Sequence, residues 1–314
     1  MNQTAIPTSS LPENVLITGA TGFIGKLLVA TMLKQGKQVT VLTRNTRQAS
    51  AMFGGKVHCV SSMKELPIDQ KIDVIVNLAG ARILGARWTE HRKSVLRLSR
   101  VGLTKSVVDW IARAQIKPRL LLSASAIGYY GIQAQEDDTP LTEDSKPQAI
   151  FMSQLCQEWE AAAGAASEYG VQVRIMRFGF VLGKQGSLPL MMLPVRLGLG
   201  GALGSGRQWL SWIHVEDILK GMTFLWDQPD LSQPVLAFNF TAPQVVRQKQ
   251  FMQIAAQILH RPCFIPTPAW PIRLLLGEQA DLLLEGQHVM PAALEKMGFQ
   301  FAFPELKAAL KNLL

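Results

Sequence analysis

This sequence has few cysteines and no long hydrophobic run, which argues against a disulfide-rich protein and against a membrane-spanning one. The 314 residues include three cysteines, far apart and odd in number, which argues against a disulfide framework and fits a reducing cytoplasm. No apolar run reaches the roughly 18 residues of a transmembrane helix. Residues 1–13 are polar and have no apolar centre, so we expect a loose tail rather than a signal peptide. The protein is thus expected to be cytoplasmic, with no membrane partner.

Metal ligands are also few. His58 lies beside Cys59 in the sequence and His260 lies near Cys263, but neither pair forms a recognised ligand set. We interpret both pairs as ordinary structural residues and predict no metal site.

The formal charge of +9 raises nucleic acid as a partner. Lys93, Arg97 and Arg100 fall on one face of an expected helix. No recognised nucleic-acid module or aromatic-glycine signature accompanies these bases. We therefore favour a solvated helix face, or a positive potential that attracts an anionic cofactor and substrate, over nucleic-acid binding.

A glycine-rich turn follows the first apolar run of the chain. Residues 15–17 predict a strand, and the periodic apolar positions over 23–33 predict a helix. Between them, Gly19 permits a tight exit from the strand and Gly22 lets backbone N–H groups approach a pyrophosphate. Gly25 lets the helix pack closely on the strand. This context predicts dinucleotide binding, with a structural turn that has lost its ligand as the alternative.

Helix and strand patterns alternate as far as residue 180, as a doubly wound parallel sheet requires. Further strands are expected over residues 39–43, 57–60, 73–77, 120–123 and 171–177. Helices are expected over residues 89–114, with Thr89 as the N-cap, 150–168 and 247–260. The predicted fold class is therefore α/β: a Rossmann-type doubly wound parallel sheet with a smaller α/β substrate lobe.

Three parts are expected after the tail. Residues 14–183 are expected to form mainly the cofactor-binding Rossmann domain. Residues 184–261 open with a glycine-rich stretch and are expected to form mainly the substrate lobe, with elements that return to the Rossmann domain. Residues 262–314 are expected to be a small helical C-terminal segment. The acidic residues between positions 136 and 144 are expected in a solvated loop near the cleft.

Several motifs resemble the extended short-chain dehydrogenase/reductase superfamily. Asn77-Leu78-Ala79-Gly80 resembles its Asn-x-Ala-Gly element, residues 120–125 resemble the strand that presents its active-site serine, and residues 213–217 resemble its His-Val-x-Asp helix start. With the glycine turn, these motifs cover about residues 14–240 in the expected order. The resemblance implies a set of cofactor-binding residues: Gly19, Thr21, Gly22, Phe23, Ile24, Gly25, Leu78, Ala79, Gly80, Ser123 and Phe178.

A narrower set of motifs resembles the bacterial "epimerase family", often called YfcH-like and labelled nucleoside-diphosphate-sugar epimerases by analogy. The motifs are Arg87-Trp88-Thr89, the stretch 125–131, Cys156-x-x-Trp159-Glu160, and the stretches 196–201 and 204–208. Residues 276–299 resemble that family's small C-terminal domain of unknown function.

The resemblance and the loop pattern together suggest a polar small-molecule substrate, with nucleotide-linked compounds as one candidate class. Trp88 and Arg207 are expected to line or cover its site, with a plain surface arginine as the equal alternative for Arg207. Dimers through two long helices are common in the superfamily, so a homodimer is an open expectation.

The end of the second expected strand lacks an acid. NAD-binding Rossmann folds place Asp or Glu there to hold the ribose hydroxyls, but this strand ends in Leu42-Thr43-Arg44-Asn45. An arginine can pair with a 2′-phosphate and stack on adenine. The sequence therefore predicts NADP(H) rather than NAD, with Arg44 as its reader. The alternative is that Arg44 points into solvent.

The usual catalytic pair of the superfamily is missing. The resemblance implies Tyr-x-x-x-Lys on the helix after the active-site serine, where the tyrosine transfers a proton and the lysine lowers its pKa. None of the three tyrosines is followed by lysine at the fourth position. Alignment on Cys156-x-x-Trp159 places Met152 and Cys156 at those positions, and a shift by one places Phe151 and Leu155 there. Both pairs are apolar.

Ser125 remains as the candidate that orients a substrate oxygen, with Tyr129 or Tyr130 as the assisting group. We favour packing against the cofactor or the lobe for the two tyrosines, because a phenol without a lysine is a poor base at neutral pH. Cys156 is a thiol ligand or nucleophile in one interpretation, and a core residue in the favoured one. The function is therefore an NADP-dependent oxidoreductase or epimerase-like enzyme, or a non-catalytic module that senses NADP(H).

Overall fold

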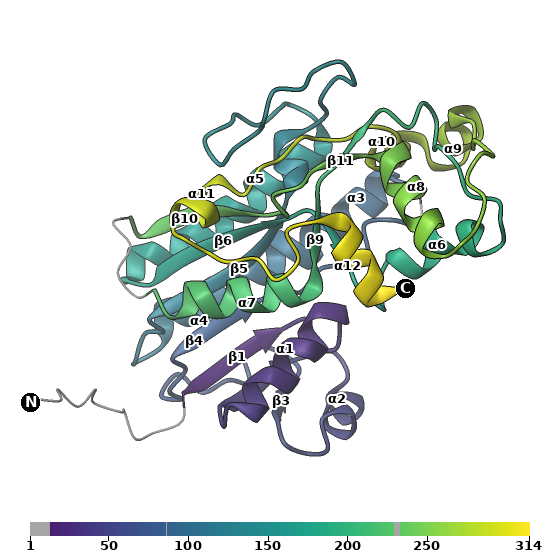
Figure 1. The fold of residues 1–314 in the computed structure, drawn as a ribbon. Helices are drawn as coiled ribbons and strands as arrows, with labels where there is room; N and C mark the ends of the chain where they lie inside the picture. Colours follow the sequence, from purple (N-terminus) through teal and green to yellow (C-terminus); the bar gives the residue numbers. More distant parts are fainter. Residues whose placement is uncertain (1–12, 86, 229–232) are drawn as a thin grey trace, which may run out of the picture.

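A seven-stranded parallel sheet forms the centre of the molecule (Figure 1). The structure is a computed structural model that describes residues 13–85, 87–228 and 233–314, so the expected tail lies outside the described residues except for residue 13. The sheet strands are β1 (Asn14–Thr18), β2 (Gln38–Leu42), β3 (His58–Val60), β4 (Val74–Asn77), β5 (Leu120–Ala126), β6 (Gln172–Phe178) and β10 (Val235–Phe240). They confirm the predicted doubly wound α/β fold.

The strand order, β10-β6-β5-β4-β1-β2-β3, reverses direction at β1. The chain passes from β1 to β2 and β3 on one side, then returns to β4 and builds β5, β6 and β10 on the other. Open parallel sheets bind ligands at the carboxyl ends of the strands beside such a switch point. Strand β10 was not among the expected strands, and it adds an edge by pairing in parallel with β6.

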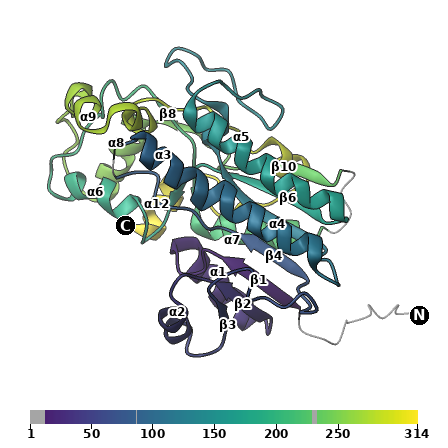
Figure 2. The same cartoon turned by 180° about the vertical axis from the view of Figure 1, so that it is seen from behind.

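Helices cover both faces of the sheet. One face carries α1 (Phe23–Lys34) and α7 (Val215–Trp226), and Figure 2 shows α3 (Glu90–Arg97), α4 (Leu103–Arg113) and α5 (Phe151–Gly164) across the other. Side chains alternate along β1, so Val15 and Ile17 join the core beneath α1 and α7, whereas Leu16 joins the core with Trp110 of α4. The strands are therefore buried on both faces. Helix α2 (Thr46–Met52) follows β2.

The helix expected over residues 89–114 is present but interrupted. Thr89 is its N-cap as predicted, and the hydroxyl of Thr89 accepts a hydrogen bond from the backbone N–H of Arg92 at 3.2 Å. Between α3 and α4 the chain makes a π-helical turn, η1 (Leu98–Gly102). Such turns insert an extra residue into a helix and are frequent at functional sites.

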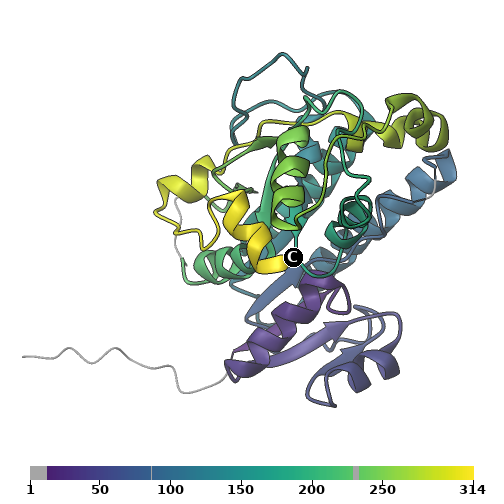
Figure 3. The same ribbon diagram turned by 45° about the vertical axis from the view of Figure 1, so that its right-hand side comes forward.

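The second lobe has a hydrophobic core of its own. Helices α6 (Leu188–Arg196), α8 (Gln248–Ile258) and α12 (Leu306–Leu313) contribute to it, and Figure 3 shows α8 beside α12. The short strands are β7 (Phe180–Leu182), which pairs with β9 (Trp212–His214), and β8 (Trp209–Leu210), which pairs with β11 (Val246–Arg247).

The C-terminal segment spans both parts of the molecule. It contains α9 (Ala269–Leu276), η4 (Gly277–Ala280), α10 (Asp281–Leu284), α11 (Ala292–Lys296) and α12. Leu294 of α11 joins the core beneath α1 and α7, whereas Leu306 and Leu310 of α12 join the core of the lobe. In the described part of the chain, no helix is both long and apolar enough to cross a membrane.

Candidate cofactor and active site

The glycine turn between β1 and α1 has the geometry of an anion cradle. Gly19 adopts a φ of 69°, and a Cβ there would lie 2.7 Å from the carbonyl carbon of Leu78. A Cβ on Gly25 would collide with the carbonyl oxygen of Gly19. Gly22 caps α1 without a side-chain hydrogen bond, so no capping side chain covers the N–H groups of the first turn. The turn thus fits a dinucleotide pyrophosphate.

A buried polar network holds the strand ends beside this turn. Thr18 donates to Asn77 at 2.7 Å, and the amide of Asn77 donates to Thr104 at 2.8 Å and to Ser123 at 3.3 Å. The Thr18 hydroxyl also accepts the backbone N–H of Ala79 at 3.2 Å. These bonds fix the backbone after β4, where cofactor contacts are predicted. Ser123 is itself fully buried within the network.

Ser125 belongs to a second buried network that crosses three strands. The strand register places Ser125 of β5, Arg177 of β6 and Asn239 of β10 in one row. The Ser125 hydroxyl donates to Glu160 of α5 at 2.6 Å, and Arg177 donates to both oxygens of Glu160, at 2.9 and 2.8 Å. Arg177 also donates to the Tyr130 hydroxyl at 2.9 Å, which in turn donates to Asn239 at 2.7 Å.

Burial sets the electrostatics of this network. It opposes the charge on Arg177, but the hydrogen bonds from Arg177 to Glu160 outweigh that cost and raise the pKa of Arg177. The side chains of Arg177 and Glu160 are 5% and 12% exposed. Burial also raises the pKa of Tyr130 to about 12, so its phenol stays protonated at neutral pH. The Tyr129 ring lies under the guanidinium of Arg177, with 3.5 Å between the ring centroid and Cζ.

Both pairs of positions that align with the superfamily's tyrosine and lysine are apolar, and the first pair, Met152 and Cys156, is buried. Met152 and Cys156 face the short helix η2 (Ile127–Tyr130), where a Cβ on Gly128 would lie 2.9 Å from the Met152 methyl group and 3.9 Å from the Cys156 sulfur. Burial raises the pKa of the Cys156 thiol to about 12, with a further contribution from Glu160. A thiol in this state is a core group rather than a nucleophile.

The other predicted site residues, Arg44, Trp88 and Arg207, have separate surroundings. Arg44 is exposed directly after β2. The Trp88 ring packs edge-on against Phe151, with 5.2 Å between centroids, and its indole N–H donates to the carbonyl of Ile83 at 3.2 Å. The Arg207 side chain is 62% exposed and forms an ion pair with Glu136 at 3.2 Å. The described structure records no contact between Arg207 and the network around Ser125.

The basic face of α3 and η1 is only partly solvated: the Arg97 side chain is 39% exposed, whereas much of Lys93 is covered. Lys93 and Arg97 both lie over the ring of Phe151, at 5.2 Å, and Arg100 lies over the ring of Trp159, at 5.4 Å. The Lys93 side chain is 14% exposed. This face therefore lies against α5, with the charged ends of the three bases over two aromatic rings of that helix.

Glu143 differs from the expectation that the acidic residues between positions 136 and 144 are solvated. Its carboxylate accepts the backbone N–H of Asn239 at 2.9 Å and that of Ala293 at 3.2 Å. Burial raises the pKa of Glu143 despite these bonds. The acid thus ties the loop to β10 and to α11.

The sequence reasoning missed Glu160, Arg177 and Asn239 as parts of the site. One signal was available: arginine inside an apolar strand of a parallel sheet is rare unless it has a partner. Arg177 is such a residue, and its partner Glu160 lies in the motif Cys156-x-x-Trp159-Glu160. Nothing in the sequence marked Asn239, because β10 itself was not expected.

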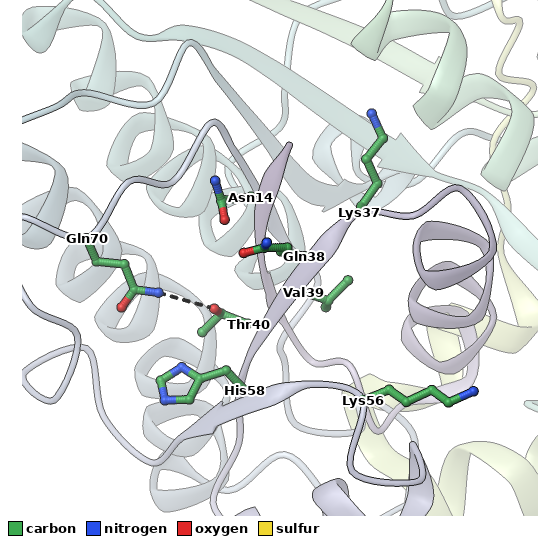
Figure 4. A pocket seen from close by; sticks show the side chains of 8 residues that line it. All are labelled: Asn14, Lys37, Gln38, Val39, Thr40, Lys56, His58 and Gln70. Carbon is green, nitrogen blue, oxygen red and sulfur yellow. Dashed lines mark hydrogen bonds between the residues drawn. The ribbon is translucent and has the colours of Figure 1, made fainter. Parts of the chain in front are cut away.

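A pocket of about 320 Å³ opens at the opposite edge of the sheet (Figure 4). Asn14, Gln38 and His58, the first residues of β1, β2 and β3, line it with Lys37 and Thr40. Because all seven strands are parallel, these amino ends lie away from the glycine turn. The pocket is therefore separate from the candidate site.

Comparison with known proteins identifies the family. Residues 15–240 match the NAD dependent epimerase/dehydratase family, and residues 267–313 match a domain of unknown function, DUF1731. The chain belongs to the NAD dependent epimerase/dehydratase family. Epimerase family protein YfhF of Bacillus subtilis (strain 168) is 37% identical over 306 residues, which cover 96% of this chain and 98% of that protein. Both observations bear out the resemblance seen in the sequence.

Solved structures of similar proteins extend the comparison. The crystal structure of human epimerase family protein SDR39U1 (isoform 2) with NADPH is 33% identical, with a TM-score of 0.83, over 96% of this chain and 98% of that one. UDP-glucose 4-epimerase of Thermotoga maritima with UDP-glucose is 15% identical, with a TM-score of 0.76, over 95% of this chain and 96% of that one. At 15% identity, the similarity to UDP-glucose 4-epimerase shows a shared fold and nothing about activity.

Proposed function

We propose that this epimerase-family protein binds NADP(H) and is an oxidoreductase or epimerase-like enzyme acting on a polar small molecule, with nucleotide-linked compounds as the first class to test. The glycine cradle, the exposed Arg44 at the end of β2 and the NADPH in the human relative support the cofactor assignment. No acid follows β2 before Arg44, so nothing there repels a 2′-phosphate.

The hydrogen bond from Ser125 to Glu160 carries the catalytic part of the proposal. A hydroxyl has one proton, and the proton of Ser125 is directed at a carboxylate 2.6 Å away. The Ser125 hydroxyl, 2% exposed, also lies within hydrogen-bonding reach of the Cys156 thiol, and its remaining lone pair would accept a hydrogen bond from a substrate hydroxyl. Arg177 fixes Glu160 and so fixes the direction of the Ser125 hydroxyl. When bound, NADP(H) supplies or accepts the hydride at the substrate carbon.

A second function is a module that holds NADP(H) and reports its occupancy without turnover. The observation that favours it is the absence of an acid–base pair at Met152 and Cys156, which are both buried. The Tyr130 hydroxyl is engaged by Arg177 and Asn239, so it does not replace the missing tyrosine without breaking those bonds.

Titration with NADPH and NADH, followed by the fluorescence of the reduced nicotinamide, tests the cofactor. A screen of carbonyl compounds and nucleotide-sugars for cofactor oxidation or reduction, and for epimerised product, then tests turnover. Ser125→Ala and Glu160→Gln are compared with Glu168→Gln, an exposed acid beyond α5. Activity that falls in the first two variants and persists in the third supports the enzyme. Full activity in Ser125→Ala contradicts it, and tight NADPH binding with no turnover favours the sensing module.

A further inference from the structure

The π-helical turn η1 directs an arginine toward the carboxyl edge of the sheet. The guanidinium of Arg100 donates to the backbone carbonyl of Ala81 at 3.0 Å, and a Cβ on Gly80 would lie 3.1 Å from its Cζ atom. Residues 80 and 81 follow the carboxyl end of β4, beside the switch point. A π turn rotates the residues of a helix relative to regular α geometry, and here it places Arg100 against this backbone.

Among the described residues, Arg100 has no acidic partner, unlike Lys93 and Arg97 of the preceding helix turns. Lys93 forms ion pairs with Glu90 and Glu278, and Arg97 forms one with Glu158. Within the described ranges, the polar contacts of the Arg100 guanidinium are the Ala81 carbonyl and the Ser99 hydroxyl, the latter at 3.4 Å.

No carboxylate of the described residues thus balances the charge of Arg100, which lies over the ring of Trp159. Burial lowers the pKa of Arg100, and the nearby charge of Arg92 lowers it further. A guanidinium has five N–H donors in a planar fork, and a single carbonyl and a distant hydroxyl leave most of them available. A partly desolvated cation with free donors gains most from a ligand that brings oxygen atoms.

The layout of the sheet decides which part of the cofactor reaches Arg100. In a doubly wound sheet the adenine ribose is read at the end of β2, where Arg44 lies, and the pyrophosphate lies at the start of α1. The rest of a dinucleotide then extends across the switch point, over β4 and β5. Arg100 and Ser125 both lie on that side.

Arg100 also lies near the helix position that lost its cation. Its charge is close enough to the Cys156 thiol to act on the pKa of that thiol, and its guanidinium lies 5.4 Å from the ring centroid of Trp159, one turn further along α5. Cys156 aligns with the missing lysine in one of the two alignments, and its neighbour Leu155 does so in the other. A positive charge is thus present beside this position, supplied by a different helix.

We propose that Arg100 binds the oxygen atoms of the nicotinamide-ribose half of NADP(H). The inference rests on the proposed cofactor and assigns to this chain a contact that acts on one half of it. In this proposal Arg44 contacts the adenine half of the cofactor and Arg100 contacts the nicotinamide-ribose half.

Binding of two ligands separates these roles without any turnover. NADPH carries both halves, whereas adenosine 2′,5′-bisphosphate carries the adenine half alone. We expect Arg100→Met to weaken NADPH binding about tenfold or more, the usual effect of losing hydrogen bonds from a charged group, and to change bisphosphate binding less than about twofold. Arg44→Ala is expected to weaken both. Arg113→Met, at the exposed end of α4, is the matched control and is expected to weaken neither.

Calorimetric titration of wild type and the three variants with each of the two ligands gives eight affinities. Thermal melting checks that each variant folds. Arg100→Gln is the second variant if Arg100→Met does not fold, and the same result is expected of it. NADPH affinity that is unchanged, or that falls together with bisphosphate affinity, overturns the role of Arg100 while the cofactor assignment stands. A wild-type protein that does not bind NADPH overturns both.

Discussion

The carboxylate of Glu160 accepts two hydrogen bonds from the guanidinium of Arg177, at 2.9 and 2.8 Å, inside the core between α5 and β6. The pair is the centre of the network that holds Ser125 and Tyr130. Two opposite charges in such a place are tolerated only together, because each one alone is a buried charge without a partner.

Replacing Glu160 by glutamine is expected to lower the free energy of unfolding by about 3 kcal/mol, because Arg177 stays charged and buried. Glu158→Gln is the control, since its ion pair with Arg97 lies at the surface, with the two side chains 41% and 39% exposed, and is expected to cost less than about 1 kcal/mol. Urea unfolding measures both. Equal losses in the two variants would show that the Glu160 pair is not a buried pair.

Arg44→Ala is expected to weaken NADPH binding about tenfold or more and to leave NADH binding within about twofold of wild type. The reason is that only NADPH carries the 2′-phosphate. Arg47→Ala, on the first turn of α2 and equally exposed, is the control. Fluorescence titration gives the six affinities of wild type and the two variants for NADPH and NADH. NADPH that binds Arg44→Ala as tightly as wild type means that another residue reads the phosphate, or that none does.

Gly25→Ala is expected to destabilise the protein by about 1–3 kcal/mol and to abolish tight cofactor binding, because the added methyl group collides with the carbonyl of Gly19. Gly164→Ala, at the end of α5, is the matched control. A Cβ there meets Val235 at 3.8 Å, an ordinary contact, so no loss is expected. Thermal unfolding and NADPH titration measure both effects. A Gly25→Ala protein with normal stability and affinity would rule out the close approach described for the turn.

Tyr130 is expected to ionise near its pKa of about 12 in an absorbance titration of the folded protein, because burial disfavours its phenolate. The unfolded chain releases this proton at about pH 10. Between these two values the folded state binds more protons than the unfolded state, so stability falls as pH rises through that window and is unaffected below it. Tyr130→Phe removes this slope. A tyrosine titration that is complete near pH 10 in folded protein would contradict the assigned environment.

Cys156 is expected to resist thiol reagents in the folded protein, because it is 2% exposed and burial raises its pKa to about 12. Cys59 and Cys263 are half-buried and are expected to react first. Thiol counting with and without denaturant measures the difference, and Cys156→Ala serves to identify the slow thiol. Rapid reaction of all three thiols without denaturant would reopen the interpretation of Cys156 as a nucleophile.

The parts that the sequence predicted correctly depend on local or periodic patterns. The glycine turn, the alternating strands and helices and the N-cap at Thr89 are each specified within a few residues. The family resemblance rested on such motifs, and the match over residues 15–240 bears it out. The sequence predicted Arg100 as a base on a helix face. The direction of its side chain depends on a π-helical turn that no short sequence pattern predicted.

The amino-acid sequence by itself determined the α/β class and the doubly wound sheet, because these follow from periodicity along the chain. It also showed that the Tyr-x-x-x-Lys pair implied by the family resemblance is missing. Only the tertiary structure decided that Ser125, Arg177 and Asn239 stand in one row and that Glu160 reaches them from α5. Strand register joins residues more than a hundred positions apart in sequence, and it is selected by packing over the whole sheet rather than by neighbours in the chain. The chemistry of the candidate site therefore resides in contacts that appear only when the sheet is complete.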